Sequence, residues 1–568
     1  MNKTSDALGR SGQDLPAPLA HSHKLMIISL DGTTWDILRP WMEAGYLPNL
    51  AKLVAGGASG ELRSTIPPVT APAWTTFQTG VHPGKHGLFH FTRYQRGSYD
   101  TALVDATSIA PRTIWRILSD AGKRVATINL PVTYPPQPLN GVVVAGLLSP
   151  SPRQAFWPPE LYDEVVAATG KYQVWIPIRS FDYLGVGGFV DQVVTLARGR
   201  AAAARYIFLK EDWDLFMVHF QSTDIIQHAL WAWADPHHPD FASKPEEERI
   251  KVRGFYETVD GLVGELSALA GKDRPVIVMS DHGFGPVLRR LYINQWLLNE
   301  GLLSAPSQSS FKGRLLGWAE QAVRKADVFK LRRRLIKPRD RGDRLLEWIK
   351  RDALISWPTT QAFALSGPFF GRIYINTLGR EKEGSVAPGP VWEALRSRIA
   401  EGLLALRDPD TGQQIVANVW RREEIYQGPR ADELPDLVVQ PADGYQVVTE
   451  FRQGLLVEPM PGFLSGTHRM EGILALGGPS IQKGVSLEGA SIADLAPTIL
   501  YLMGLPVPTS MDGQVLVAAL DEALLAERPI RFVEDEEISA DRSEREDSYS
   551  EEDSAEVKAR LAGLGYLS

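Results

Sequence analysis

Two pairs of acidic and imidazole side chains have the types and spacing that metal chemistry requires. Asp281 and His282 come after the apolar run 275–279, with Ser280 between the run and the pair. A short run rich in Val and Ile, bounded by Pro and Gly, predicts a buried strand, and an open α/β sheet places its chemistry at the carboxyl ends of such strands. Asp224 and His228 are four residues apart, so on a helical turn both face the same way. A buried carboxylate is costly unless it is paired or binds a metal, which makes both pairs candidate ligands.

Three further segments supply the remaining ligands and a nucleophile. Asp31 ends the apolar run 25–30, His468 lies in a predicted loop, and Thr70 lies between prolines in Pro-Pro-Val-Thr-Ala-Pro. The chain has no Cys, which excludes disulfides and thiolate zinc sites. Three Asp and three His suffice for two divalent cations, and this donor set suits zinc ahead of manganese or iron. Two such cations can clamp an in-line displacement at phosphorus and activate a threonine hydroxyl as the nucleophile.

Each of these residues has a simpler interpretation when it is taken alone. The alternative for Asp31 is a helix cap, for Thr70 a turn threonine, and for Asp224 with His228 a surface helix pair. We favour the metal centre because all five segments occur together in one chain.

Composition sets the class of protein and of partner. The chain has 568 residues, 44% hydrophobic and 23% charged, which is typical of a soluble globular protein with two or more domains. Its net charge of −8 argues against a nucleic acid polymer, so the expected partner is a small phosphate-containing substrate. We find no run of about 18 apolar residues, so we expect no membrane span and a cytoplasmic protein.

The order of strand-like and helical patterns predicts an α/β fold. Apolar runs alternate with helical periodicity, which predicts a mostly parallel sheet with helices on both faces. The strand-like runs are 25–30, 123–130, 141–146, 212–220 and 275–279, and the helical patterns are 35–43, 188–209 and 246–270.

Shifts in composition divide the chain into five parts. The basic middle part contains the run Arg332 to Arg334, which is either a solvated helix face or a positive rim that attracts an anionic substrate. The parts are a flexible extension (1–24), a first core part (25–298), an inserted basic helical cap (299–367), a second core part (368–525) and an acidic, largely disordered tail with one short helix (526–568).

The five motifs, in this order, resemble the type I phosphodiesterase/nucleotide pyrophosphatase branch of the alkaline phosphatase superfamily. The resemblance spans about residues 24–518 and implies an alkaline phosphatase-like fold. It also implies that one zinc is surrounded by Asp31, Thr70, Asp281 and His282, and a second is held by Asp224, His228 and His468. Thr70 would then attack phosphorus and form a phosphothreonine intermediate.

The chain departs from the family pattern at one position. Members that cleave nucleotides carry an Asn beyond the threonine, whereas Ala71, Ala73 and Trp74 stand close behind Thr70. The departure bears on nucleotide specificity, whereas the metal ligands and the nucleophile are kept. From these, phosphodiester or pyrophosphate cleavage is our first expectation for the reaction. A phosphomonoesterase, a phosphonate hydrolase, a phosphomutase and a non-catalytic metal-binding protein on the same scaffold are the alternatives.

Overall fold

A nine-stranded sheet forms the centre of the computed structural model, which describes residues 23–305, 355–365, 367, 369–462, 464–534 and 548–567. The strand order is β19-β2-β18-β9-β1-β8-β5-β6-β7. β1 is parallel to both neighbours, and β18 is antiparallel to both of its own. The predicted mostly parallel α/β fold is confirmed. The strands are β1 (Leu25–Leu30), β2 (Ala58–Arg63), β5 (Val125–Leu130), β6 (Gly141–Ala145), β7 (Phe156–Trp157), β8 (Leu215–Phe220), β9 (Val276–Met279), β18 (Glu471–Gly477) and β19 (Val485–Leu487).

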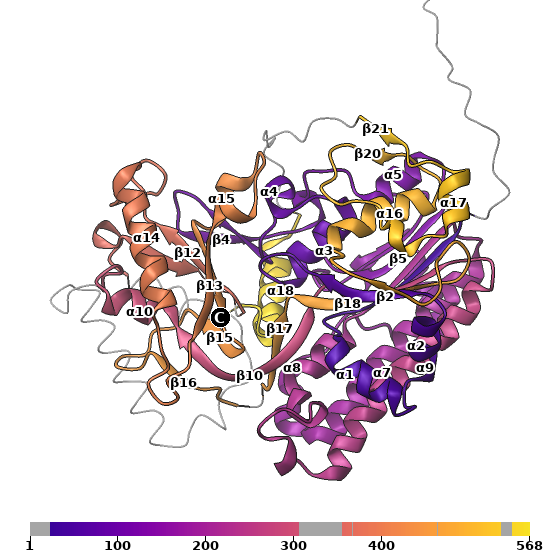
Figure 1. Cartoon of the computed structure of the whole chain (residues 1–568), viewed down its shortest axis with the longest axis horizontal. Coiled ribbons are helices and arrows are strands. Elements are labelled where there is room, and N and C mark those ends of the chain that lie inside the picture. Colours follow the sequence, from indigo (N-terminus) through magenta and orange to yellow (C-terminus); the bar gives the residue numbers. More distant parts are fainter. Residues whose placement is uncertain are drawn as a thin grey trace, which may run out of the picture.

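Helices cover both faces of this sheet (Figure 1). Side chains alternate across a strand, so Leu25 and Ile27 of β1 join one hydrophobic cluster while Met26 and Ile28 join another. A strand buried on both faces reads as a continuous apolar run, which is why β1 was visible in the sequence. The first cluster includes helices α3 (Thr70–Thr79), α5 (Ile114–Asp120) and α16 (Leu495–Leu502), and the second includes α1 (Trp35–Glu43), α2 (Pro48–Ala55), α7 (Phe181–Lys210), α8 (Ser222–Ala234) and α9 (Glu246–Ala270).

Residues 355–459 form a second lobe, and this corrects the domain boundary expected from the sequence. We expected the core to resume at residue 368, but the chain returns to the nine-stranded sheet only at β18. The lobe has its own hydrophobic cluster, which also includes α10 (Ile293–Asn299) and α14 (Pro390–Leu404). Its strands are β11 (Ala362–Leu365), β12 (Gly371–Ile375), β13 (Val416–Arg421) and β14 (Leu437–Pro441), beside β10 (Gly283–Tyr292), β15 (Gly444–Val448) and β16 (Val457–Pro459).

Several sequence expectations lie largely outside the described residues. These are the extension 1–24, most of the cap 299–367 with its Arg332 to Arg334 run, and the acidic stretch 535–547. Of the expected tail, residues 526–534 and 548–567 are described, and helix α18 spans Glu551–Gly563. The shorter elements are α4 (Pro83–His86), α6 (Leu161–Thr169), α15 (Arg422–Ile425), α17 (Glu522–Glu527), β3 (Thr92–Gln95), β4 (Asp100–Leu103), β17 (Gly466–Arg469), β20 (Val507–Pro508) and β21 (Phe532–Val533). Within the described ranges, no helix is both long and apolar enough to span a bilayer.

Candidate dinuclear metal site

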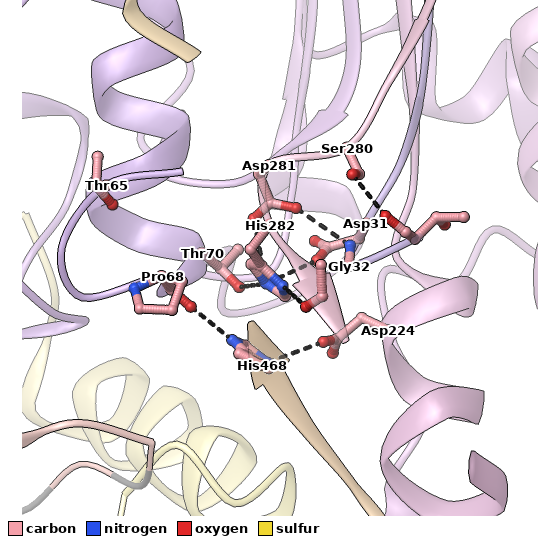
Figure 2. A network of polar contacts seen from close by, with 12 residues as sticks. Asp31, Gly32, Thr65, Pro68, Thr70, Asp224, Ser280, Asp281, His282 and His468 are labelled. Carbon is pink, nitrogen blue, oxygen red and sulfur yellow. Dashed lines mark hydrogen bonds and ion pairs between the residues drawn. The ribbon is translucent and has the colours of Figure 1, made fainter. Parts of the chain in front are cut away.

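Three carboxylates gather at the carboxyl ends of three adjacent strands. Asp31 follows β1, Asp281 follows β9, and Asp224 lies in the first turn of α8 just beyond β8. β1 lies between β9 and β8 and is parallel to both, so the three strands end at the same edge of the sheet. All three Asp side chains are completely buried. Figure 2 shows them pointing toward one another.

The predicted nucleophile and the last imidazole approach from other elements. Thr70 is the first residue of α3, a helix that the prolines around it had hidden in the sequence. His468 lies on β17 and not in the expected loop, and it pairs with Phe284 of β10. Figure 2 shows Thr70 beside His282 and His468 facing Asp224.

The imidazoles and carboxylates form two compact groups. In the first, Nε2 of His282 lies 3.4 Å from Oδ1 of Asp31 and 3.4 Å from Oδ2 of Asp281. Oγ1 of Thr70 is 3.5 Å from the same Nε2. In the second, Oδ1 of Asp224 lies 3.3 Å from Nε2 of His228 and 3.2 Å from Nε2 of His468.

The two groups adjoin each other. The rings of His282 and His468 stack with their centroids 3.7 Å apart. The structure therefore brings together all seven residues that the sequence analysis selected, in the two sets that the family resemblance implied.

The backbone fixes the tautomer of each of the three imidazoles. Nδ1 of His228, His282 and His468 lies 3.2, 3.1 and 2.8 Å from the carbonyl oxygens of Gly466, Gly283 and Pro68. A carbonyl can only accept, so each Nδ1 carries the proton and each Nε2 presents a lone pair. The Nε2 atoms of His228 and His468 are only 3.1 Å apart. Two lone pairs that face each other at this distance repel, and a cation bound beside them would relieve that repulsion.

The site carries uncompensated negative charge. Both carboxylate oxygens of Asp31, Oδ1 of Asp224 and Oδ2 of Asp281 have no hydrogen-bond partner among the described residues. Burial, together with the charges of Asp281 and Asp224, raises the pKa of Asp31 well above its usual value. Burial also raises the pKa of Asp281 to about 7.

His282 and His468 do not supply the missing positive charge. Burial lowers the pKa of His282 to about 4 and that of His468 to about 3, so both rings are neutral near pH 7. Neutral imidazoles and unpartnered carboxylate oxygens are the donors that zinc binds. The donor set therefore fits two divalent cations.

His219 lies beside the site on a strand, and the sequence analysis did not select it as a site residue. It lies on β8, fully buried, with Nε2 3.2 Å from Oδ2 of Asp31 and Nδ1 3.0 Å from the hydroxyl of Ser29. Nε2 forms no hydrogen bond with a described residue, so His219 is a close neighbour of Asp31 and not a donor to it. The only signal in the sequence was a polar residue inside an otherwise apolar strand.

A buried arginine near the site was also missed. Arg372 on β12 is only 3% exposed, and its Nε and Nη2 have no hydrogen-bond partner within the described ranges. A Cβ atom on Gly367 would lie 3.0 Å from Nη2 of Arg372 and 2.8 Å from Nε2 of His90. Two residues beyond Gly367, Phe369 stacks on His468 with a centroid distance of 3.8 Å. Gly367 therefore lies beside Arg372, and Phe369 lies beside His468.

The chain combines an α/β fold with two adjoining groups of buried Asp and His that could hold metal ions, and comparison with known proteins gives the family. The family model described as "Type I phosphodiesterase / nucleotide pyrophosphatase" matches residues 25–470, which is more than half of the chain. The chain belongs to this family. A search of curated proteins found no match.

One solved structure supports the fold. Phosphonoacetate hydrolase from Sinorhizobium meliloti 1021, in complex with phosphonoformate, is 18% identical with a TM-score of 0.50, and the match covers 85% of this chain and 95% of that one. Human ectonucleotide pyrophosphatase/phosphodiesterase 5 is 14% identical with a TM-score of 0.45, and the match covers 87% and 97%. At these identities the likeness concerns the fold alone.

Proposed function

We propose that this chain is a hydrolase that cleaves phosphodiester or pyrophosphate bonds at a dinuclear zinc site, with Thr70 as the nucleophile. One observation carries the proposal: a buried threonine hydroxyl at the start of α3 lies beside two buried groups of Asp and His whose imidazoles present lone pairs. A site with metal ligands alone would need no such hydroxyl.

Each zinc would have its own set of ligands. Asp31, Asp281 and His282, together with Thr70, would hold one, and the other would be held by Asp224, His228 and His468. When bound, the two cations would neutralise phosphoryl charge and lower the pKa of a coordinated hydroxyl.

Thr70, the N-terminal end of α3 and the burial of the site each have a separate role in the reaction. Oγ1 of Thr70 forms a bond to phosphorus while the bond from phosphorus to the leaving oxygen breaks, and water then cleaves the phosphothreonine ester and restores the hydroxyl. The N-terminal end of α3 favours negative charge on the phosphoryl oxygens, because Val69 at its N-cap provides no side-chain hydrogen bond to the first amides. Burial of all the site residues excludes bulk water from the reaction.

Arg372 favours a second candidate, a substrate with an additional negative charge. A buried guanidinium without a partner is costly, so an anionic group in the bound substrate would stabilise it. A pyrophosphate, a phosphate monoester or a phosphonate with a carboxylate carries such a group. The fold neighbour phosphonoacetate hydrolase was solved with phosphonoformate, which is an anion of this kind.

The decisive experiment combines turnover with trapping of the intermediate. Zinc-loaded protein is assayed on bis-p-nitrophenyl phosphate, and acid-quenched samples are digested and analysed by mass spectrometry. We expect turnover that chelator abolishes and a p-nitrophenyl phosphate adduct on the peptide containing Thr70. Thr70→Ala should lose more than about 1,000-fold in kcat while it still binds zinc, because the covalent route is removed.

Thr75→Ala is the matched control, because the Thr75 hydroxyl lies in the same helix and bonds only to the backbone carbonyl of Ala71 at 2.8 Å. It should keep turnover within a few-fold of the unmodified chain. Equal turnover of Thr70→Ala and the unmodified chain would rule out this nucleophile. An inert, zinc-loaded protein would leave the non-catalytic alternative.

A further inference from the structure

The C-terminal segment 548–567 packs on the core as a folded element. Tyr549 donates a hydrogen bond to the carbonyl of Leu148 at 3.0 Å and stacks on Tyr134 with a centroid distance of 5.3 Å. The guanidinium of Arg560 is buried and donates to the carbonyls of Leu147 and Pro150, both at 2.9 Å. Figure 1 shows α18 lying between the nine-stranded sheet and the second lobe.

The inner face of this segment belongs to the main core. Val557, Leu561 and Leu564 are at most 2% exposed and join the same hydrophobic cluster as β1 and α8. The burial of these side chains and the anchors at both ends of α18 hold the residues beyond the helix in a defined place.

The residues beyond α18 reach the candidate metal site. Tyr566 is completely buried, and its hydroxyl donates a hydrogen bond to Oδ2 of Asp224 at 3.0 Å. The same hydroxyl lies 3.3 Å from Oγ1 of Thr70. Its ring contacts Phe91 at a centroid distance of 4.7 Å and Phe369 at 5.9 Å, so aromatic packing fixes where the hydroxyl points.

We infer that Tyr566 is a residue of the active site whose hydroxyl donates a hydrogen bond to the phosphoryl group that Thr70 attacks; this inference rests on the proposed function. Phosphorus bonds to Oγ1 in the intermediate, so the non-bridging oxygens come to lie next to Oγ1. A hydroxyl 3.3 Å from Oγ1 is within reach of such an oxygen. A donor is useful there because negative charge develops on those oxygens in the transition state.

A phenol suits this position better than a charged donor. The O–H bond turns about the C–O axis, so the proton that Asp224 now accepts can be directed to a phosphoryl oxygen. The hydroxyl stays neutral and requires no counter-ion in a buried site. The segment 548–567 thus completes a site that otherwise comes from residues 31–468.

Two variants test this role in the full, zinc-loaded protein. Tyr566→Phe removes only the hydroxyl, and a chain that ends at Gly565 removes the whole side chain while α18 keeps its anchors. We expect both to lower kcat on bis-p-nitrophenyl phosphate by about 10- to 1,000-fold, as for other single donors to a developing oxyanion. KM should change less than threefold, and both variants should still bind two zinc ions per chain. Orthovanadate, which mimics the transition state at phosphorus, should bind at least tenfold more weakly by calorimetry.

Tyr549→Phe is the control, because it removes the hydroxyl of a half-buried tyrosine in the same segment, and that hydroxyl bonds to the carbonyl of Leu148 and not to a site residue. It should leave kcat and vanadate affinity within about twofold. Unchanged kcat and vanadate affinity in Tyr566→Phe would overturn the inference. Higher activity of the chain ending at Gly565 would also overturn it, because the segment would then act as an inhibitory cover.

The outcomes separate this inference from the proposed function. If the unmodified chain turns over through Thr70 and Tyr566→Phe does so equally well, only the inference fails. If the unmodified chain is inert, the proposed function fails, and the vanadate affinities of the unmodified chain and Tyr566→Phe still decide whether the hydroxyl contacts a phosphoryl-like ligand.

Discussion

At the scale of the residue, the site is defined by charges that the protein itself leaves unbalanced. The carboxylates of Asp31, Asp224 and Asp281 are buried beside the neutral imidazoles of His282 and His468, so bound cations would balance their charge. Arg372 presents the opposite imbalance, a buried cation whose Nε and Nη2 have no hydrogen-bond partner among the residues that the structure describes. Buried charges are costly unless they are paired, so each imbalance points to a ligand of opposite sign.

Replacing Arg372 should therefore change the choice of substrate more than the rate in general. We expect Arg372→Met to lower kcat/KM for p-nitrophenyl phosphate at least tenfold, because a charge-assisted hydrogen bond contributes about 1.5–3 kcal/mol. The value for bis-p-nitrophenyl phosphate, which has no additional charge, should change less than threefold. Arg372→Lys, which keeps the charge, should retain part of the preference. Equal losses on both substrates would show that Arg372 acts on the fold and not on the substrate.

At the scale of the element, the second group of ligands depends on how closely β17 approaches α8. A Cβ on Gly466 would lie 2.3 Å from the backbone oxygen of Gln227. Only glycine permits this approach, which brings His468 of β17 within reach of Asp224 and His228 of α8. The sequence showed the glycine beside His468 but not the helix against which it packs, because that contact joins residues more than 200 positions apart.

Gly466→Ala should weaken this metal site without changing a ligand. The added methyl group must push β17 away from α8, at a cost of about 1–3 kcal/mol in the free energy of unfolding. We expect zinc content to fall from two toward one per chain, measured by elemental analysis after dialysis. Gly261→Ala in α9 is the control, since nothing lies within 4 Å of its added Cβ, and it should bind two zinc ions. Full zinc content in Gly466→Ala would contradict the proposed dependence on this contact.

At the scale of the whole molecule, local patterns revealed the sheet but not what surrounds it. β1 and β9 are continuous apolar runs and were visible, as was α9, whose helical periodicity gave its bounds of residues 246 and 270. The second lobe was missed because its antiparallel pairings join distant short strands. The docking of 548–567 was missed because acidic composition hides the few buried residues of α18, which depend on tertiary contacts for their burial.

Removing the charge of one of these buried carboxylates should change the free energy of unfolding in opposite directions with and without metal. Without metal, three close carboxylates repel one another, so Asp281→Asn should raise the free energy of unfolding by about 1–3 kcal/mol. The amide oxygen can still accept the hydrogen bond that the amide of Gly32 donates at 3.2 Å, so the local geometry is kept. With zinc at 100 times its dissociation constant, the unmodified chain should gain about 2.7 kcal/mol per site, whereas the variant should gain less because it has lost a ligand.

The order of stability should therefore reverse on addition of zinc, as measured by urea denaturation of both proteins in chelator and in excess zinc. Asp273→Asn, which neutralises an exposed carboxylate just before β9, should follow the unmodified chain in both conditions. If Asp281→Asn is instead less stable in chelator, the carboxylates do not repel one another in the folded state. The site would then be balanced by groups of the protein itself, and the physical case for two bound cations would fail.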